Sequence, residues 1–247
     1  MGINKILRFI SFVALCAFAA FSSFYDRIQR HTDSLVEERN VTNEHAYVIN
    51  KSLTSAVRVM SSFGGENNND ITSSSSGTYF VHNDISYVLT AAHSLVGECE
   101  NTTIIAGDYA FQCLDVVSVD PFKDIGILQV ENVFNRAPIS VYDLLMHDEI
   151  DQNIPVHEKL IYTGFPQGLG PLTFDGKVIS HEIVNSTFFA HSYAWAGSSG
   201  SGVFNSDGKL VGVITAVSVA NSEYGVDVME DLIIVTSVEL IDFRNVL

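Results

Sequence analysis

From residue 55 onward, the chain consists of short runs of β-branched and aromatic residues that are separated by Gly, Asn, Asp and Ser. Runs of this composition favour strands, and the residues between them favour turns. The runs are AVRVM (56–60), TYFVH (78–82), SYVLTAA (86–92), TTIIAG (102–107), DVVSV (115–119), IGILQV (125–130), KLIYTG (159–164), KVISHEIV (177–184), KLVGVITAV (209–217) and DLIIVTS (231–237). Asp175-Gly176 and Asp207-Gly208 stand between runs and predict hairpin turns. The pattern predicts an all-β fold, built as barrels or as a sandwich.

The segments outside these runs have other patterns. Residues 24–50 are polar and charged and predict a stalk that is partly helical. Residues 61–77 (SSFGGENNNDITSSSSG) predict an exposed loop. Apolar residues at helical spacing between Val238 and Leu247 predict a short C-terminal helix.

The first 23 residues have the pattern of a targeting segment. A basic start that holds Lys5 and Arg8 precedes the apolar stretch 9–21, and small residues follow between Ala19 and Ser23. This order is typical of a secretory signal peptide. An uncleaved membrane anchor is the alternative, because the apolar stretch approaches the length of a spanning helix. Both interpretations predict that the rest of the chain is exported: secreted, periplasmic, or tethered to a membrane.

The charge balance excludes one class of function. The 247 residues carry a formal net charge of −16, and no Lys or Arg lies between Arg58 and Lys123. Binding of nucleic acid requires clustered basic side chains that displace counterions. The sequence therefore predicts no nucleic-acid partner, and contact with a membrane only through the N-terminal segment.

Three cysteines are present, and Cys16 lies in the targeting segment. Cys99 and Cys113 remain as a pair in a chain that is expected to be exported. One disulfide between them is favoured over the alternative of two buried thiols. Neither has a second Cys or a His at the spacing of metal ligands, so no metal site is expected.

Two motifs can supply a base and its partner. His93 follows a strand-forming run in LTAAHS (89–94), where small neighbours leave its side chain free to enter a cleft. A surface histidine is the plainer alternative. Asp124 stands in DPFKDIGIL (120–128), directly before an apolar strand. A carboxylate at that edge of the core can accept the imidazole N–H, fix the tautomer and stabilise the imidazolium.

The third motif is the Gly- and Ser-rich segment AGSSGSGVFN (196–205). By composition alone, it predicts a loop. It also precedes a strand–turn–strand pattern, VFNSDGKLVGVI, which places a serine on a tight turn with free backbone N–H groups. Such a turn can supply both a nucleophile and an oxyanion hole.

In the order His, Asp, Ser, these motifs resemble those of the chymotrypsin-fold (trypsin-like) serine proteases. Together with YTGFPQGLGPLTFDGKVIS (162–180), they are most similar to HtrA/DegP-like proteases, and the resemblance covers residues 55–237. It implies two antiparallel six-stranded β-barrels with the active site between them. Residues 51–135 would form the first barrel, and residues 136–247 the second barrel with the C-terminal helix.

The resemblance also implies a mechanism that needs no metal or organic cofactor. His93 takes the proton of the attacking serine hydroxyl, and Asp124 orients His93. Alignment with the pattern Gly-x-Ser-Gly-Gly/Ser puts the nucleophile at Ser199 rather than at Ser201. The backbone N–H groups of Gly197 and Ser199 form the oxyanion hole. The substrate is a polypeptide, which is cleaved through an acyl-enzyme.

Two residues depart from the family pattern. Ser198 stands where Asn or Asp is usual, and Gly202 stands where Pro is usual. The expected consequence is a looser turn, which slows the enzyme or leaves the oxyanion loop unformed until substrate binds. The PDZ domains of many HtrA members have no counterpart in this sequence, so gating through such domains is not expected.

By resemblance, the specificity pocket lies around Tyr193 and the segment of Thr215, Ala216 and Val217, which pairs with substrate as a strand. The segment 193–196 holds no acid of the kind that selects Lys or Arg. This favours a neutral, small or aliphatic residue before the cut. Recognition of an acidic or amide side chain by His191 is the alternative.

Three function classes follow. The favoured class is an exported or membrane-tethered serine endopeptidase. The alternative is an inactive, protease-like binding protein, which the departures at Ser198 and Gly202 favour and the intact His–Asp–Ser set disfavours. A structural surface protein without a reactive serine is the third class.

Overall fold

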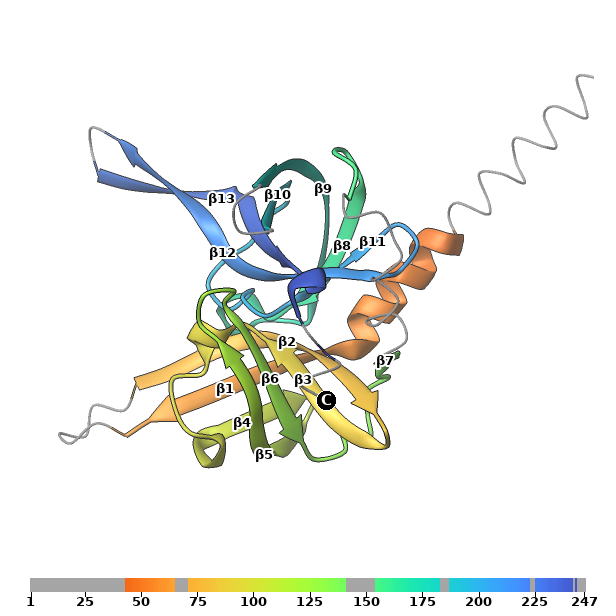
Figure 1. Ribbon diagram of the computed structural model, residues 1–247, viewed down its shortest axis with the longest axis vertical. Coiled ribbons are helices and arrows are strands. Elements are labelled where there is room, and N and C mark those ends of the chain that lie inside the picture. Colours follow the sequence, from red (N-terminus) through yellow and green to blue (C-terminus); the bar gives the residue numbers. More distant parts are fainter. Residues whose placement is uncertain are drawn as a thin grey trace, which may run out of the picture. The chain divides into compact units, whose positions relative to one another are not determined.

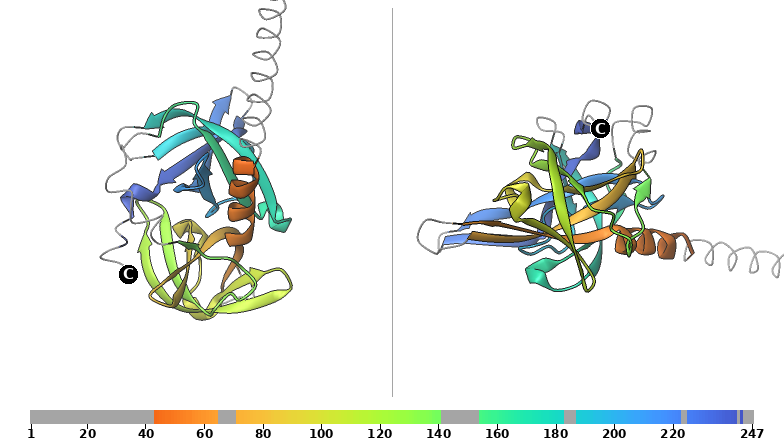
Figure 2. Two further views of the ribbon diagram at one scale, coloured as in Figure 1. Left: turned by 90° about the vertical axis from the view of Figure 1, so that its right-hand side faces the viewer. Right: turned by 90° about the horizontal axis from the view of Figure 1, so that it is seen from below.

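The computed structural model describes residues 43–64, 71–140, 154–182, 187–222, 225–241 and 243. The predicted signal or anchor segment (1–23) and the predicted stalk up to residue 42 lie outside these residues. Most of the described chain forms two closed six-stranded antiparallel β-barrels, which confirms the predicted fold class (Figures 1 and 2). Among the described residues, no helix is long and apolar enough to span a membrane.

The first barrel consists of β1 (Ala56–Phe63), β2 (Ile71–His82), β3 (Ile85–Thr90), β4 (Thr102–Ala106), β5 (Tyr109–Asp120) and β6 (Ile125–Val130). The strand order is β1-β4-β5-β6-β3-β2, and antiparallel pairing of β1 with β2 closes the barrel. A short strand, β7 (Ile139–Ser140), adds to β2 in parallel. Because side chains alternate along a strand, one side chain in two faces the interior. The core includes Val57, Val59, Tyr79, Val88, Ile104 and Leu128.

The second barrel consists of β8 (Lys159–Gly164), β9 (Leu172–Glu182), β10 (Thr187–His191), β11 (Gly202–Asn205), β12 (Leu210–Ser222) and β13 (Gly225–Ser237). The strand order is β10-β13-β12-β11-β8-β9. Beyond the barrel, β12 and β13 continue to pair with each other and form the two-stranded ribbon at the upper left of Figure 1. The core includes Leu160, Tyr162, Val178, Phe188, Val203, Ile214 and Val235.

A third apolar cluster joins the two barrels. Phe80, Leu89 and Ile127 of the first barrel belong to one buried cluster with Phe204 and Val213 of the second. Burial of apolar surface stabilises the contact. The cluster therefore provides a fixed base for the loops that the two barrels present at their junction.

One expectation about turns is wrong and one is confirmed. Asp175 and Gly176 lie within β9, paired with β8, and residues 165–171 connect the two strands. Gly176 is required by a close approach, because a Cβ there would lie 2.6 Å from the His191 carbonyl oxygen. The turn at Asp207-Gly208 does join β11 to β12, with Gly208 at a φ of +75°.

The Ser-rich segment 61–77 is strand over most of its described length, which corrects the expected loop. β1 extends to Phe63, β2 begins at Ile71, and the whole of β1 pairs with residues 71–78 of β2. Ser75 and Ser76 are buried. A serine-rich composition predicts a loop, but pairing with β1 and packing against the second barrel determine the structure here.

A helix covers residues 43–55 and leads into β1. Val48 is buried in the cluster between the barrels, and the Lys51 ammonium donates a hydrogen bond of 2.7 Å to the Gly208 carbonyl. The last residues of the predicted polar stalk thus pack on the folded body, because the helix has an apolar face.

After β13, the chain forms a single 3-10 turn, η5 (Val238–Leu240). Val238 and Phe243 are buried in the cluster between the barrels. Within the described residues, this turn lies in the predicted C-terminal helix, Phe243 is again helical, and residues 242 and 244–247 lie outside the described chain.

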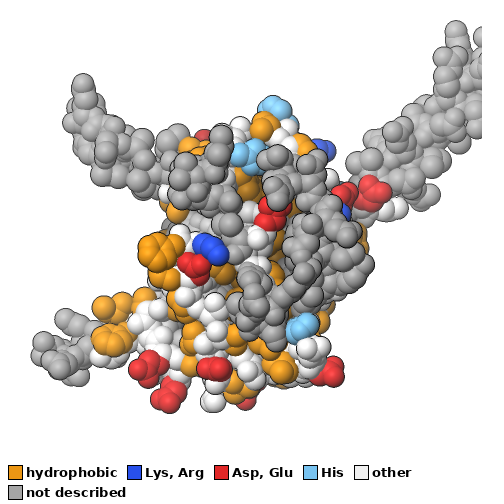
Figure 3. Space-filling view, in the orientation of Figure 1, with side chains coloured by type: hydrophobic (Ala, Val, Ile, Leu, Met, Phe, Trp, Pro, Cys, Tyr) orange, Lys and Arg blue, Asp and Glu red, His pale blue; other side chains and the backbone are white. Residues whose placement is uncertain are grey.

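Acidic side chains gather over the first barrel, in the lower part of the face shown in Figure 3. The sequence of this barrel contains no Lys or Arg between Arg58 and Lys123 to balance them.

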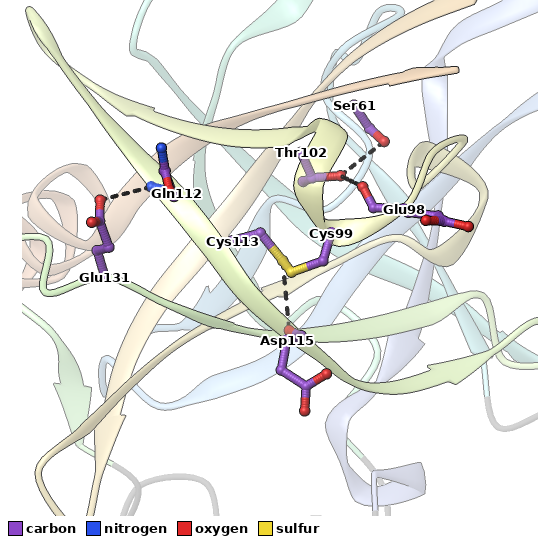
Figure 4. The surroundings of a disulfide bond; sticks show 8 residues. All are labelled: Ser61, Glu98, Cys99, Thr102, Gln112, Cys113, Asp115 and Glu131. Carbon is purple, nitrogen blue, oxygen red and sulfur yellow. Dashed lines mark hydrogen bonds between the residues drawn. A yellow bond between two sulfur atoms is a disulfide. The ribbon is translucent and has the colours of Figure 1, made fainter. Parts of the chain in front are cut away.

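Cys99 and Cys113 form a disulfide, which confirms the favoured interpretation (Figure 4). The bond joins the 3-10 turn η2 (Cys99–Asn101) to β5, and the two Cα atoms are 5.2 Å apart. Cys113 is buried in the core of the first barrel, and Cys99 packs against that core. Beside the disulfide, the Thr102 hydroxyl lies 3.1 Å from the Glu98 carbonyl oxygen and fixes the turn.

Candidate active site

His93 lies just beyond the end of β3, in the one-turn 3-10 helix η1 (Ala92–Ser94). Ala92 and Ser94 are buried, whereas 51% of the His93 side chain is exposed. The Ala92 N–H donates to the Asp124 carbonyl oxygen at 3.1 Å. The buried neighbours fix the backbone and leave the imidazole outside the core.

Asp124 ends the turn between β5 and β6. The Asp120 carboxylate builds this turn by accepting the backbone N–H groups of Phe122 and Lys123, both at 3.0 Å. Asp124 has a φ of +55°, a left-handed conformation that Asp tolerates better than most residues. Its carboxylate accepts two hydrogen bonds from His93, at 2.6 Å from Nδ1 and at 2.8 Å from the backbone N–H.

This contact fixes the tautomer of His93. Because Nδ1 carries the proton that is donated to Asp124, the neutral imidazole presents Nε2 as an acceptor. The hydrogen bond to Asp124 raises the pKa of His93, burial lowers it, and the charge of Asp124 raises it further, so the net change is upward. The structure thus brings His93 and Asp124 together as a bonded pair.

Two hydroxyl groups of the second barrel support the loop that carries Asp124. Thr236 of β13 donates to the Lys123 carbonyl oxygen at 3.1 Å, and its hydroxyl oxygen lies 3.2 Å from that of Thr215. Both threonines are buried. The turn before Asp124 is therefore held from both barrels.

Ser199 and Ser201 have very different surroundings. Ser199 is partly exposed, and its hydroxyl makes no hydrogen bond to the described part of the chain. Ser201 is fully buried, and its hydroxyl has no hydrogen-bond partner among the described residues and would lie 2.3 Å from a Cβ at Gly164. A buried hydroxyl cannot reach a substrate carbonyl, so this difference favours Ser199 over Ser201 as the candidate nucleophile.

Gly200 brings the serine turn against the segment that leads to His93. Its φ is +88°, and a Cβ there would lie 2.0 Å from the Ser76 carbonyl oxygen and 3.0 Å from the Ala91 nitrogen. Only glycine allows this approach without strain. Ser199, one residue earlier, therefore lies at the junction where β3 ends and His93 follows.

The two predicted oxyanion N–H groups are uncommitted, and the peptide groups that contain them are fixed. Within the described residues, neither the Gly197 N–H nor the Ser199 N–H donates a hydrogen bond. The Ala196 carbonyl accepts from the Gln167 N–H at 2.6 Å, and the Ser198 carbonyl accepts from the Ser201 N–H at 3.1 Å. In a trans peptide, C=O and N–H point in opposite directions. Each carbonyl contact therefore directs the adjoining N–H away from it.

Both departures from the family pattern have hydrogen-bond partners here. Ser198 is buried, and its hydroxyl accepts from the Trp195 N–H at 3.3 Å and bonds to the Tyr162 hydroxyl. Burial raises the pKa of Tyr162, so this phenol stays neutral. The Gly202 N–H donates to Thr78 Oγ1 at 2.9 Å, a bond that proline could not make. The described turn is thus anchored at the two positions that were expected to loosen it.

Strand β2 contributes residues that the sequence interpretation missed. The Ser76 N–H donates to the Ser199 carbonyl at 2.8 Å, and the Ser76 hydroxyl donates to the Gly197 carbonyl at 2.7 Å. Together with Thr78, Ser76 links the first barrel to the serine turn. The available signal was the serine run directly before the strand TYFVH, which composition assigned to a loop.

The predicted substrate-binding residues have different environments. β12 pairs with β11 up to Val213, and two backbone bonds join Ile214 to the serine turn; beyond it, the described β12 pairs only with β13. Within the described chain, the edge at Ala216 and Val217 has no second strand partner, as strand addition requires. The Thr215 side chain instead faces inward to Thr236.

Tyr193 is 56% exposed and stacks on Trp195 with the ring centroids 6.1 Å apart. His191, the alternative specificity residue, has Asp231 4.0 Å from its Nε2. Both of these side chains are exposed. In the described ranges, no three His, Cys, Asp or Glu side chains are grouped so that they could hold a metal ion.

The structure combines two barrels, a His–Asp pair just beyond a strand of the first barrel, and a serine turn just before a strand of the second. This combination defines the two-barrel peptidases of the trypsin type. The trypsin-like peptidase domain matches residues 75–213, and the chain belongs to this family. The matched range contains His93, Asp124 and Ser199.

Comparison with solved structures agrees with the fold. The chain is similar to the crystal structure of the serine endoprotease from Yersinia pestis, with a TM-score of 0.57 and 19% sequence identity. The similarity covers 80% of this chain and 62% of that chain, so this chain spans less than two thirds of the other's length. No curated protein matches the chain in sequence.

Proposed function

We propose that the protein is a serine endopeptidase of the HtrA-like type, exported or tethered to a membrane by its N-terminal segment. Membership of the trypsin-like peptidase family supports hydrolysis of polypeptides. The disulfide between Cys99 and Cys113 supports export, because such bonds persist in oxidising compartments.

In the proposed mechanism, His93 Nε2 takes the proton from Ser199 Oγ as this oxygen attacks a peptide carbonyl. Asp124 holds the imidazole in the required tautomer and stabilises the imidazolium. The N–H groups of Gly197 and Ser199 bind the negative oxygen of the tetrahedral intermediate. His93 then protonates the leaving amine, and water attacks the resulting acyl-enzyme with His93 again as the base.

One observation carries this proposal: the serine turn holds an uncommitted hydroxyl and two uncommitted N–H groups next to the end of β3, which leads to the His93–Asp124 pair. Preorganised donors of this kind are typically worth about 3 kcal/mol each in the transition state.

The test is covalent labelling of the purified full-length chain with a fluorophosphonate, with the modified residue located by mass spectrometry. We expect labelling at Ser199, and its loss in Ser199→Ala and in His93→Ala. Ser201→Ala is the matched control, because its hydroxyl is buried, and labelling should survive. A folded wild type that remains unlabelled would overturn the proposal and leave the inactive binding protein.

The proposed site accepts a neutral, small or aliphatic residue before the cut. The edge of β12 at Ala216 and Val217, which is unpaired among the described residues, supports strand-like binding of the substrate. The exposed ring of Tyr193, stacked on Trp195, offers an uncharged contact. A peptide library that is cleaved preferentially after Lys, Arg, Asp or Glu would contradict this specificity.

Export is tested by the mass of the protein that is recovered from fractionated cells. A soluble extracytoplasmic form that begins between residues 20 and 24 would establish a cleaved signal. An intact chain in the membrane fraction would establish an anchor. An intact chain in the cytoplasm would exclude both.

A further inference from the structure

Ser76 is fully buried at the junction of the barrels, and it makes four hydrogen bonds there. Its hydroxyl accepts the Phe165 N–H at 2.8 Å and donates to the Gly197 carbonyl at 2.7 Å. Its backbone N–H donates to the Ser199 carbonyl at 2.8 Å, and its carbonyl accepts the Thr90 hydroxyl at 2.7 Å. One residue of the first barrel thus holds the carbonyl groups of both residues whose N–H groups face the proposed oxyanion.

The Ser76 hydroxyl also joins two segments of the second barrel, the backbone around Phe165 and the serine turn at Gly197. The backbone of 165–167 surrounds Gly197, because a Cβ there would lie 2.6 Å from the Phe165 carbonyl oxygen. The Gln167 N–H holds the Ala196 carbonyl and so directs the Gly197 N–H. Ser76 Oγ bonds to Phe165 at one end of this arrangement and to Gly197 at the other.

Backbone and side chain contribute differently at this position. Any residue except proline could supply the N–H that binds Ser199. Only a small side chain that is both a donor and an acceptor can bridge the Phe165 N–H and the Gly197 carbonyl, and a hydroxyl has both functions. A serine at position 76 is therefore needed for the geometry of the proposed oxyanion hole, whereas many residues could form the strand.

We propose that Ser76 is a positioning residue for the oxyanion hole. Its hydroxyl holds the carbonyl side of Gly197, while Gln167 holds the peptide on the N–H side, so that together they fix the backbone of Gly197 in the conformation that stabilises the transition state. This inference rests on the proposed serine peptidase function. Ser76 does not touch the substrate; it acts through Gly197.

The test compares Ser76→Ala with Ser75→Ala in the full-length chain. Ser75 is the matched control, because it is a buried serine on the same strand whose hydroxyl has no partner. The measurements are the second-order rate constant for fluorophosphonate labelling and the 31P resonance of the labelled protein. Melting curves establish that each variant is folded. Ser76→Cys keeps the volume and replaces the hydroxyl by a weak donor, so it carries the test if Ser76→Ala does not fold.

We expect the labelling rate to fall about tenfold or more in Ser76→Ala, since loss of one oxyanion donor typically costs about 100-fold or more. Ser75→Ala should stay within about twofold of wild type by the same comparison. The 31P resonance should move only in the Ser76 variants, because the P=O oxygen binds the same N–H pair. Equal rates and an unmoved resonance in a folded Ser76 variant would overturn the inference alone. An unlabelled wild type would overturn the proposed function, and this inference with it.

Discussion

In the proposed mechanism, the His93–Asp124 contact determines the pH range in which His93 acts as a base. A protonated imidazole cannot accept the Ser199 proton, so this mechanism requires the neutral form. The hydrogen bond to Asp124 raises the pKa of His93 and therefore moves the loss of activity to a higher pH than an isolated histidine would show. The raised pKa of His93 affects the free energy of unfolding in the opposite direction, because it is the protonated imidazole that stabilises the fold. The stability that the pair adds is fully present below the unfolded pKa of His93 and is lost as the pH rises through the folded pKa.

We predict that the rate of Ser199 labelling falls on acidification with a midpoint above about 6.5, the ordinary value for histidine. In Asp124→Asn the main cause of the upward shift is removed and burial remains, so the midpoint should move down. The plateau rate should fall by about 10⁴-fold, since the wrong tautomer is favoured. The check is the labelling rate from pH 5 to 9 for both proteins. A wild-type midpoint at or below 6.5 would contradict the prediction.

At the scale of single residues, the sequence predicted much of the candidate site. It paired His93 with Asp124 and preferred Ser199 to Ser201. It did not find Ser76, because a serine in a serine run has no distinguishing pattern. What selects Ser76 is its contact with Gly197, 121 positions away in the chain, and no local pattern encodes such a contact.

Among the elements, β2 differs most from its prediction. Runs of β-branched and aromatic residues predict strands, and the run 78–82 was found for this reason. The preceding part of β2 packs against the other barrel through backbone and hydroxyl groups, so it lacks apolar residues. The prediction of a turn at Asp175-Gly176 was wrong because a strand can also require glycine. At Gly176 a neighbouring backbone approaches too closely for any side chain, whereas in a turn glycine is required by a positive φ.

The disulfide connects two elements of the first barrel, and its removal gives a prediction at this scale. Cross-linking of residues 14 positions apart restricts the unfolded chain, and a loop of that size is worth about 3 kcal/mol. Cys99→Ala/Cys113→Ala should therefore lower the free energy of unfolding by about this amount in urea titrations. Reductant should lower the stability of the wild type similarly and leave the double variant unchanged. An equal response of both proteins to reductant would contradict this assignment.

For the whole molecule, the two barrels and their order could be predicted from resemblance, and the closure of each barrel agrees with it. The helix at 43–55 could not be assigned to the body, because a polar sequence with a single apolar face has no marker of what it packs against. Val48 acquires its role only when β2, β3 and the C-terminal turn come together around it.

The net charge of −16 leads to a prediction for the molecule as a whole. A negative protein attracts cationic peptides, and salt screens this attraction over about 10 Å at 0.1 M. If the peptidase function holds, kcat/KM for a peptide flanked by lysines should fall about two- to tenfold between 20 mM and 500 mM salt. A peptide with the same cleavage site and glutamine flanks is the control and should change little. Equal salt dependence of both peptides would show that the charge plays no part.

The bond from Thr236 to the Lys123 carbonyl has a consequence for synthesis of the chain. A ribosome releases Ser199 well before it releases β13, whose pairing with β10 and β12 closes the second barrel. Until then, the turn before Asp124 lacks its support from the second barrel, and the proposed nucleophile lies in an unfinished domain. The support of Asp124 is therefore one of the last features of the fold to form during synthesis, because it depends on the last strand of the described chain.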